Sequence, residues 1–568
     1  MFAKTCYWYF CFTPISIPNI SERIFGFSEY LTAVALLAVL FTITDFRFKF
    51  RLAVTPSHLY RNSYVVLALI GILSLLTEVW IAEEWFVPVT VGLDYHIWQM
   101  MLGLLFLVTF LTWIYYAFIN PPIFGKRNAH KYAVALYKVI VKSSNEELKV
   151  IADELARSAS TLIKYVESLP RHPTQKNKAD YKDFAHDILL LMGNRRLCKY
   201  IVATSQVTAQ AFFDEMVKGK KYNIPIIQFA RNILTEAISQ KESFLYSEGE
   251  DGIYSGLLGY LKPVSNSLYG NFTLIETLAL NGFSPFDVDY DELRSWDSNQ
   301  WKAYCRAALM TINSYLVDGN DTPQFSSIRR VCENVKHACI DLRKLDGMDS
   351  TYESEIAKTF SVLVEFVKQI IELINKQPNP PWPIPKVDKG RYTTDIYDLL
   401  ANLIFEFCFQ AATVKSPRHT SWELQFNIVW ESFFGSERGA TWSIVRYKVR
   451  RQLYDSIVKL NNLPNYKSSR VLGFCLNILI DANKPTNQNY YDRADYPLAK
   501  AVQNWTNKNY LQLRKINSDI ADSVLLGSIS FDEKGRRLVK TYSKGLRTEE
   551  PKTYLNLRVA RSRRKPPV

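Results

Sequence analysis

The sequence of 568 residues is 48% apolar and 14% aromatic, which is sufficient for packed cores and excludes a chain that is disordered throughout. Its formal net charge is +14, but residues 534–568 contain twelve Lys or Arg and two Glu, so the rest of the chain is nearly balanced. This distribution excludes a body that is basic throughout, as many nucleic-acid-binding domains are.

Three strongly apolar stretches in the first fifth of the chain predict transmembrane helices. They lie near Phe27–Thr44, Tyr64–Ile81 and Ile97–Ile119. A helix that spans a bilayer needs about 20 apolar residues, and each stretch approaches that length. The first is the weakest, because Glu29 lies near its start. A buried helix of a soluble domain explains one such stretch but not three in succession.

The charges of the connecting loops predict the orientation of these spans. The loop after the first span opposes Asp45 with four basic residues, Arg47, Lys49, Arg51 and Arg61. The loop after the second span has no Lys or Arg and carries Glu83, Glu84 and Asp94. Because loops rich in Lys and Arg stay in the cytoplasm, we expect a multi-pass protein of the cell membrane with its N-terminus outside and its C-terminal body inside.

The first 26 residues form an extracytoplasmic or interfacial segment in this scheme. Pro14 and Pro18 interrupt its aromatic run, so whether residues 5–20 enter the bilayer stays open. Cys6 and Cys11 either pair outside the cell or stay reduced at the interface.

Helical periodicity dominates the rest of the chain. Ser144 and Glu147 have the spacing of a capping box, and apolar residues recur every three or four positions from Leu148 to Val166. Further helices are predicted near 181–191, 202–216, 225–239, 300–317, 326–345, 352–375, 392–414, 422–434 and 442–460. Residues 529–531 and 537–542 predict a small hairpin. The predicted fold class is therefore an all-α membrane protein with three N-terminal spans, a large helical cytosolic region and a C-terminal β-hairpin.

The composition predicts six segments. Residues 1–26 form the N-terminal segment, 27–120 the three-span domain and 121–376 a helical cytosolic domain. Residues 377–386 are rich in proline and predict a semi-rigid linker. A second helical region at 387–533 and a polybasic tail at 534–568 complete the chain. No repeat of fixed period is present, although irregular helix pairs of a solenoid kind stay open.

No motif for metal or cofactor binding is complete, so we expect neither. Cys332, His337 and Cys339 do not share one helical face, and eight scattered cysteines indicate buried thiols. The acidic stretch at 287–291 lacks the glycine and the glutamate of a calcium loop.

The acidic, glycine-rich segment near residue 250 is the one candidate catalytic loop. Its carboxylates belong to Glu248, Glu250 and Asp251. The segment has no phosphate-binding lysine motif, and an exposed turn is the alternative.

Two basic segments are candidate binding surfaces. Arg446, Lys448, Arg450 and Arg451 lie in a predicted helix, where we expect a solvated face rather than a nucleic-acid surface. The end of the tail, with Arg558, Arg561, Arg563, Arg564 and Lys565, is a candidate contact for anionic lipids. Nucleic acid is the less favoured partner of this tail.

These observations favour a non-enzymatic membrane protein whose cytosolic helical body binds an unknown protein partner or senses a signal, as an anchor, scaffold or sensor. One alternative is a homo-oligomeric, pore-forming effector of the defence or toxin kind, by analogy of architecture. A second alternative is a membrane-tethered enzyme that uses the Glu248–Asp251 loop.

Overall fold

The computed structural model describes residues 5–7, 10–14, 25–43, 45–56, 59–83, 85–88, 95–142, 144–168, 179–248, 253–257, 259–261, 263–317, 325–348, 354–377, 395–435, 437–481 and 490–558. The chain divides into two compact units, Met1–Ile233 and Leu234–Val568. Most described residues are helical, which confirms the helical character of the predicted fold. The proline-rich linker predicted at 377–386 lies outside the described residues, apart from Gln377.

Residues 5–7, 10–14 and 86–88 form a small antiparallel sheet. Its strands are β1 (Thr5–Tyr7), β2 (Phe10–Pro14) and β3 (Phe86–Pro88), with β2 between the other two. Cys6 lies opposite Cys11, and Thr13 lies opposite Val87. The expectation of an all-α chain is therefore wrong here, because the N-terminal segment pairs with a strand about 75 residues further along the chain.

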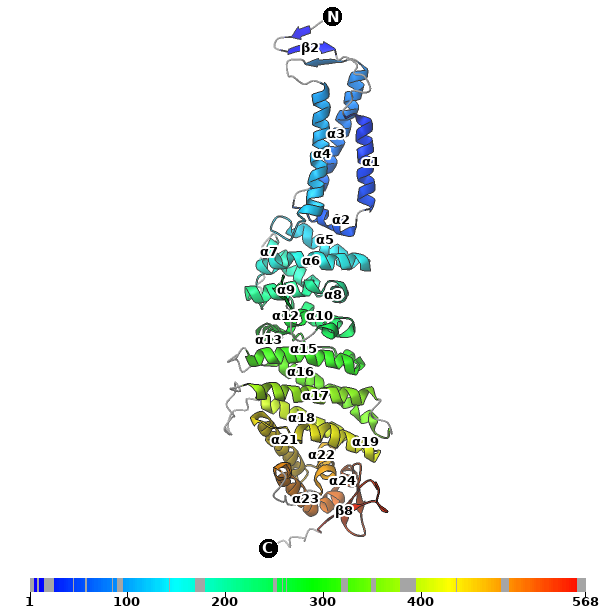
Figure 1. The fold of residues 1–568 in the computed structure, drawn as a ribbon, viewed down its shortest axis with the longest axis vertical. Helices are drawn as coiled ribbons and strands as arrows, with labels where there is room; N and C mark the ends of the chain where they lie inside the picture. Colours follow the sequence, from blue (N-terminus) through cyan, green and yellow to red (C-terminus); the bar gives the residue numbers. More distant parts are fainter. Residues whose placement is uncertain are drawn as a thin grey trace, which may run out of the picture. The chain divides into compact units, whose positions relative to one another are not determined.

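Three apolar helices connect this sheet to the rest of the first unit (Figure 1). They are α1 (Phe27–Ile43), α3 (Leu59–Ala82) and α4 (Tyr95–Ile114), and α4 continues into a π-helix, η3 (Tyr115–Ile119). Two of these segments, Arg61–Ala82 and His96–Ile119, are long and apolar enough to cross a membrane. The apolar part of α1, Phe27–Val39, is shorter.

Tyr30 holds α1 against α3. The Tyr30 hydroxyl donates a hydrogen bond to the Leu67 carbonyl at 2.8 Å, and its ring lies directly on Gly71. A Cβ atom at Gly71 would lie 2.7 Å from Tyr30 Cε1, so this approach requires glycine.

The remainder of the first unit is a group of short helices. They are α2 (Phe46–Ala53), α5 (Ala129–Lys142), α6 (Asn145–Tyr165), α7 (Tyr181–Met192), α8 (Arg195–Thr204) and α9 (Gln206–Gly219). The capping box predicted at Ser144 and Glu147 is confirmed, since each side chain accepts a hydrogen bond from the other residue's amide. The apolar stripe of α6 is buried and faces α8 and α9.

The second unit contains most of the helices. After α10 (Ile227–Ser239), which crosses the unit boundary, come α11 (Phe244–Ser247), α12 (Val264–Tyr269), α13 (Phe272–Leu280), α14 (Tyr290–Ser295), α15 (Ser298–Val317), α16 (Ser326–Cys339), the 3-10 helix η4 (Ile340–Leu345) and α17 (Glu355–Lys376). They are followed by α18 (Ile396–Ala411), α19 (Arg418–Trp422), the π-helix η5 (Glu423–Trp430), α20 (Glu431–Phe434), α21 (Ala440–Lys459), α22 (Tyr466–Leu479), α23 (Tyr490–Ile516) and α24 (Ser518–Asp522).

Neighbouring helices of this unit pack in layers. Helix α15 packs on α17, α16 on α18, α18 on α21 and α22 on α23 (Figure 1). Packing of these helices buries apolar side chains, such as Phe360 of α17 and Phe407 of α18, whose ring centroids lie 5.6 Å apart. The glycine-rich segment forms a short hairpin, with β4 (Ile253–Ser255) paired to β5 (Gly259–Leu261).

Carboxylates from distant helices fix where two helices of this unit begin. Glu276 of α13 accepts hydrogen bonds from the Ser326 amide (2.6 Å) and from the Ser327 amide (3.0 Å) and hydroxyl (2.6 Å) at the start of α16. Glu355 of α17 accepts bonds from the Ser298 amide and hydroxyl at the start of α15. These contacts satisfy amides that have no partner inside their own helix.

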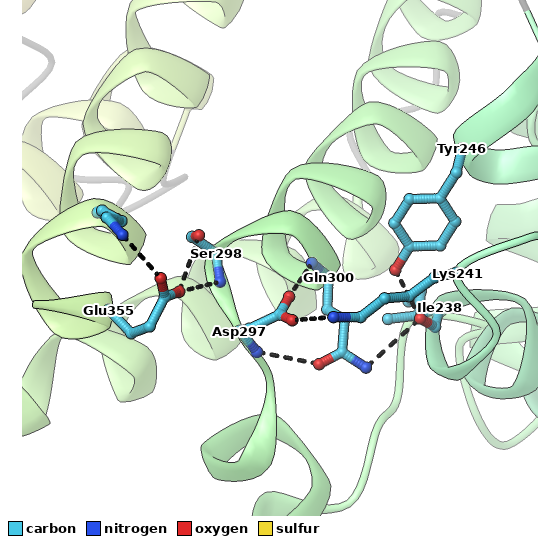
Figure 2. A network of polar contacts seen from close by, with 8 residues as sticks. Ile238, Lys241, Tyr246, Asp297, Ser298, Gln300 and Glu355 are labelled. Atoms are coloured by element: carbon cyan, nitrogen blue, oxygen red, sulfur yellow. Dashed lines mark hydrogen bonds and ion pairs between the residues drawn. The ribbon is translucent and has the colours of Figure 1, made fainter. Parts of the chain in front are cut away.

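Figure 2 shows the second of these helix starts. The Asp297 and Gln300 side chains each accept a hydrogen bond from the other's backbone amide, at 2.9 Å in both cases. Lys241 Nζ donates to Asp297 at 2.7 Å, and this bond holds the pKa of Asp297 below its usual value. The network ties the segment after α10 to the first turn of α15.

A three-stranded antiparallel sheet ends the described chain. It contains β6 (Ile529–Asp532), β7 (Arg537–Thr541) and β8 (Lys552–Asn556), in that order. The predicted hairpin is confirmed as β6 and β7, and β8 adds a strand that the sequence did not predict. Two of the three strands lie inside residues 534–568, so the basic tail proper is shorter than that segment.

Candidate functional site at the junction of the apolar helices and the helical body

The junction is built around α2, the short helix that connects α1 to α3. Its sequence FRFKFRLA alternates apolar and basic residues, a pattern typical of a strand, yet it is helical and buries Phe50 and Leu52. Leu52 forms a small apolar cluster with Leu59 and with Ala117 of η3. In this arrangement, Arg47 and Arg51 of the same helix lie against α6.

A buried ion pair crosses the junction. Arg51 Nη2 lies 2.6 Å from Glu154 Oε1, and Arg51 Nε lies 3.1 Å from Glu154 Oε2. Arg51 Nη1 also donates to the carbonyl of Ala117 at 2.9 Å. The two side chains are only 10% and 6% exposed, so the charges are largely removed from water. One guanidinium thus binds α6 and η3 at the same time.

A second, more exposed contact lies beside this pair. Arg47 Nη2 binds Asp153 Oδ2 at 2.8 Å, and its Nε lies 3.6 Å from Glu154 Oε1. Two consecutive acidic residues of α6 therefore face two arginines one turn apart on α2.

The segment between η3 and α5 is fixed by Asn128. Its amide nitrogen donates to the carbonyls of Val54 (2.8 Å) and Ile123 (2.9 Å), and its oxygen accepts from the Gly125 amide (2.8 Å). Lys131 Nζ donates to the Thr55 carbonyl at 3.2 Å. The chain that leaves α2 is thereby bound to the start of α5.

Ser158 closes the junction from the side of α6. Its hydroxyl lies 3.0 Å from the Tyr132 hydroxyl and accepts a hydrogen bond from the Phe124 amide at 3.1 Å. Burial raises the pKa of Tyr132 far above its usual value, so this phenol stays neutral. Hydrogen bonds of Arg51, Asn128 and Ser158 thus connect the elements of the junction, with no nucleophile and base arranged for catalysis among the residues named.

Sequence reasoning missed this site. In the sequence, Arg47 and Arg51 were interpreted only as charges that set the orientation, and neither Asp153 nor Glu154 was singled out. The available signal is the position of Glu154 between Ile151 and Leu155 on the buried side of α6, because a carboxylate on an apolar face needs a cationic partner.

The predicted catalytic loop is placed only in part. Glu248 accepts hydrogen bonds from the amides of Val264 (2.9 Å) and Ser265 (3.0 Å) and from the Ser265 hydroxyl (2.8 Å). Its own carbonyl accepts a bond from Arg306 Nη2. Glu248 therefore caps α12, while Glu250 and Asp251 lie outside the described residues.

Of the predicted basic tail contacts, only Arg558 lies within the described chain. Its amide donates to the Asn507 carbonyl at 2.8 Å, and its side chain is exposed. Arg561, Arg563, Arg564 and Lys565 lie outside the described residues.

Of the four basic residues of α21, Arg451 is exposed as the sequence predicted, but the other three do not form a solvated face. Arg446 is buried and donates to three carbonyls, those of Phe433, Gly435 and Glu437. Lys448 binds Asp398 at 2.5 Å, and Arg450 binds Asp495 at 2.5 Å. Carboxylates of the same unit therefore pair with Lys448 and Arg450, and backbone carbonyls accept the hydrogen bonds of Arg446.

The cysteine cluster is structural. Cys332 and Cys339 are buried free thiols, and burial raises the pKa of Cys332 to about 12. His337 packs edge-on against Tyr290. Within the described parts of the chain, no group of three or more His, Cys, Asp or Glu side chains is arranged to hold a metal ion.

Comparison with known proteins assigns no relative. No protein-family model matches the sequence, and no curated protein or solved structure matches it significantly. The function must therefore be argued from the geometry alone.

Proposed function

We propose that the protein is a multi-pass membrane protein in which α1, α3 and α4 with η3 cross the bilayer. The observation that carries this proposal is the exposure of the apolar helices. Only 22% of the apolar window of α3 and 11% of that of α4 with η3 is buried. A helix of this composition in a soluble protein is mostly buried, whereas a lipid-facing helix exposes apolar side chains to the hydrocarbon.

The loop charges support an N-out, C-in orientation for these three spans. Helix α2 is basic and joins the body through Arg51, so the body and this loop lie on the same side of the bilayer. Because basic loops stay in the cytoplasm, that side is the cytoplasmic one.

The helical body is proposed to act as a scaffold that binds a protein partner at the membrane. Two observations support a scaffold over an enzyme. Glu248 is occupied in capping α12, and Arg51 and Glu154 of the junction are paired with each other. Layered helices expose extended surfaces that suit protein binding. The basic end of the chain adds a contact for anionic lipids.

The membrane proposal is tested by extraction and protease protection of the full chain. We expect the protein to remain in the membrane at alkaline pH and to need detergent for release. A tag after Val568 should be cleaved by protease in inside-out vesicles and protected in sealed cells. Release by alkali alone, or cleavage of the tag in sealed cells, would contradict the proposal.

The same cells distinguish the scaffold from a pore-forming oligomer. The scaffold predicts an unchanged membrane potential on expression. A depolarisation that Leu105→Asp abolishes, with insertion preserved, would favour the pore instead.

A further inference from the structure

Cys6 and Cys11 occupy directly opposed positions in the N-terminal sheet. They pair across the antiparallel strands β1 and β2, one position before and one position after the pair Tyr7 and Phe10. Residues 8 and 9 alone connect the two strands. We propose that Cys6 and Cys11 form a disulfide within one chain, in the oxidising compartment that the N-out orientation gives them. This inference rests on the proposed orientation.

The backbone register meets the geometric requirement for such a bond. Directly opposed residues of an antiparallel pair have Cα atoms about 4.5 or 5.5 Å apart, depending on whether they share hydrogen bonds. Disulfides join cysteines whose Cα atoms are about 4.4–6.8 Å apart. Both kinds of opposed pair lie within that range, so the two strands need no rearrangement.

The other six cysteines do not compete for this bond. All six are buried in the helical body and outside any disulfide: Cys198, Cys305, Cys332, Cys339, Cys408 and Cys475. Burial raises the pKa of Cys332 and Cys475 to about 12, which suppresses the reactive thiolate. The pairing of Cys6 with Cys11 is therefore the specific outcome of oxidation.

The reaction is thiol–disulfide exchange with a disulfide donor of the extracytoplasmic compartment. A thiolate from one cysteine attacks the donor and forms a mixed disulfide, and the second cysteine displaces the donor thiol. Two S–H bonds are lost, one S–S bond forms, and two protons and two electrons reduce the donor to its dithiol.

The disulfide would attach β2, the strand that pairs with β3, covalently to β1. Because β2 lies between β1 and β3, a covalent link between β1 and β2 restricts both neighbours of the central strand. The connection between α3 and α4 is thereby attached to a closed hairpin.

The experiment counts thiols on the full chain, purified from membranes after alkylation during lysis. Without reductant, denatured protein should take up six alkyl groups, and with reductant it should take up eight. The Cys6→Ser variant should take up seven in both conditions. Peptide mapping should recover Cys6 and Cys11 in one crosslinked fragment, and a non-reducing gel should show a monomer.

Three results would overturn the proposal. Eight alkyl groups without reductant would show that no bond forms, a Cys6→Ser count that rises with reductant would show another pairing, and a dimer on the non-reducing gel would show a bond between chains.

A membrane-impermeant maleimide, applied to intact cells after an impermeant reductant, separates this failure from failure of the orientation. Labelling of Cys6 and Cys11 in intact cells would support an N-terminus outside the cell, whatever number of alkyl groups the thiol count gives. Labelling only after lysis would place it inside and reject the orientation.

Discussion

Arg51 and Glu154 are separated by 103 residues of sequence, yet they form a two-bond ion pair that is almost wholly buried. The arginine belongs to the short connection between two apolar helices, and the glutamate belongs to the first long helix of the body. The pair therefore joins the apolar helices to the helices of the body within the first unit.

Loss of one member of the pair should destabilise the first unit strongly. Glu154→Leu leaves the Arg51 charge buried without its partner, which costs about 3–5 kcal/mol. For a unit of this size, we expect the thermal midpoint in detergent to fall by about 10 °C.

The matched control is the exposed pair of Glu146 with Lys149. Glu146→Gln should change stability by less than about 0.5 kcal/mol. The double variant Arg51→Met/Glu154→Leu should recover much of the loss, because no buried charge remains. Equal effects of Glu154→Leu and the double variant would contradict this account of the pair.

The same substitution should have a different effect once α2 is removed. In a fragment that begins at Lys126, Glu154 faces water instead of Arg51. We therefore expect Glu154→Leu to change the unfolding free energy of this fragment by less than about 1 kcal/mol. In the full chain, the expected loss is about 3–5 kcal/mol. Urea titrations of the fragment and of the full chain, each with and without Glu154→Leu, measure the difference. A large loss in the fragment would show that Glu154 stabilises α6 by contacts within the body.

Glu276 should stabilise the second unit through the start of α16. Glu276→Ala removes the acceptor for two amides and one hydroxyl, and unsatisfied buried donors cost about 1–3 kcal/mol. Chemical denaturation of the full chain measures the loss. The control is Glu333→Gln, because Glu333 is exposed and pairs only with Arg330 among the contacts described here. If both variants were equally stable, the cap would have no energetic role.

Stability should fall as the pH rises above 9, in part because of Cys475. Burial raises the pKa of this thiol from 9.0 to about 12, so the unfolded chain releases the proton at a lower pH than the folded chain. A raised folded-state pKa gives stability that is complete below pH 9 and is lost toward pH 12.

The loss attributable to one thiol at pH 10 is about 1.4 kcal/mol. We expect Cys475→Ala to be less stable than the unaltered protein at pH 8. The difference in unfolding free energy between the two proteins should be smaller by this amount at pH 10. Urea unfolding midpoints of both proteins at pH 8 and pH 10 test this prediction. Between pH 7 and pH 8, the difference in unfolding free energy should be constant. A difference that is also constant up to pH 10 would show that Cys475 does not titrate in this way.

Local signals in the sequence predicted several elements correctly. The capping box at Ser144 and the stripe of α6 depend on residues within a few turns, and the structure contains both. The β6–β7 hairpin has a short polar connection and was predicted for the same reason. Residues 202–216, predicted as one helix, are two, because α8 ends at Thr204 and α9 begins at Gln206.

Elements defined by distant contacts were missed. Helix α22 is buried on most sides, including Leu472, Phe474 and Cys475, so it lacks the amphipathic period that identifies a surface helix. Strands β1 and β3 have three residues each and gain their identity only by pairing with β2. For the Arg51–Glu154 pair, the position of Glu154 on the apolar side of α6 indicates that a cation is needed, but nothing in either local sequence identifies that cation as Arg51, 103 residues away.

The π-helix η3 sets the rotational phase between α4 and the helices of the first unit that follow it. A π-turn accommodates one residue more than an α-turn, so deletion of a single residue from Tyr115–Ile119 would restore regular helix. Each residue of an α-helix turns the chain by about 100°, and the deletion would therefore rotate the Ala117 carbonyl away from Arg51. The length of this short segment therefore determines whether its groups that contact α2, Ala117 among them, meet that helix in register.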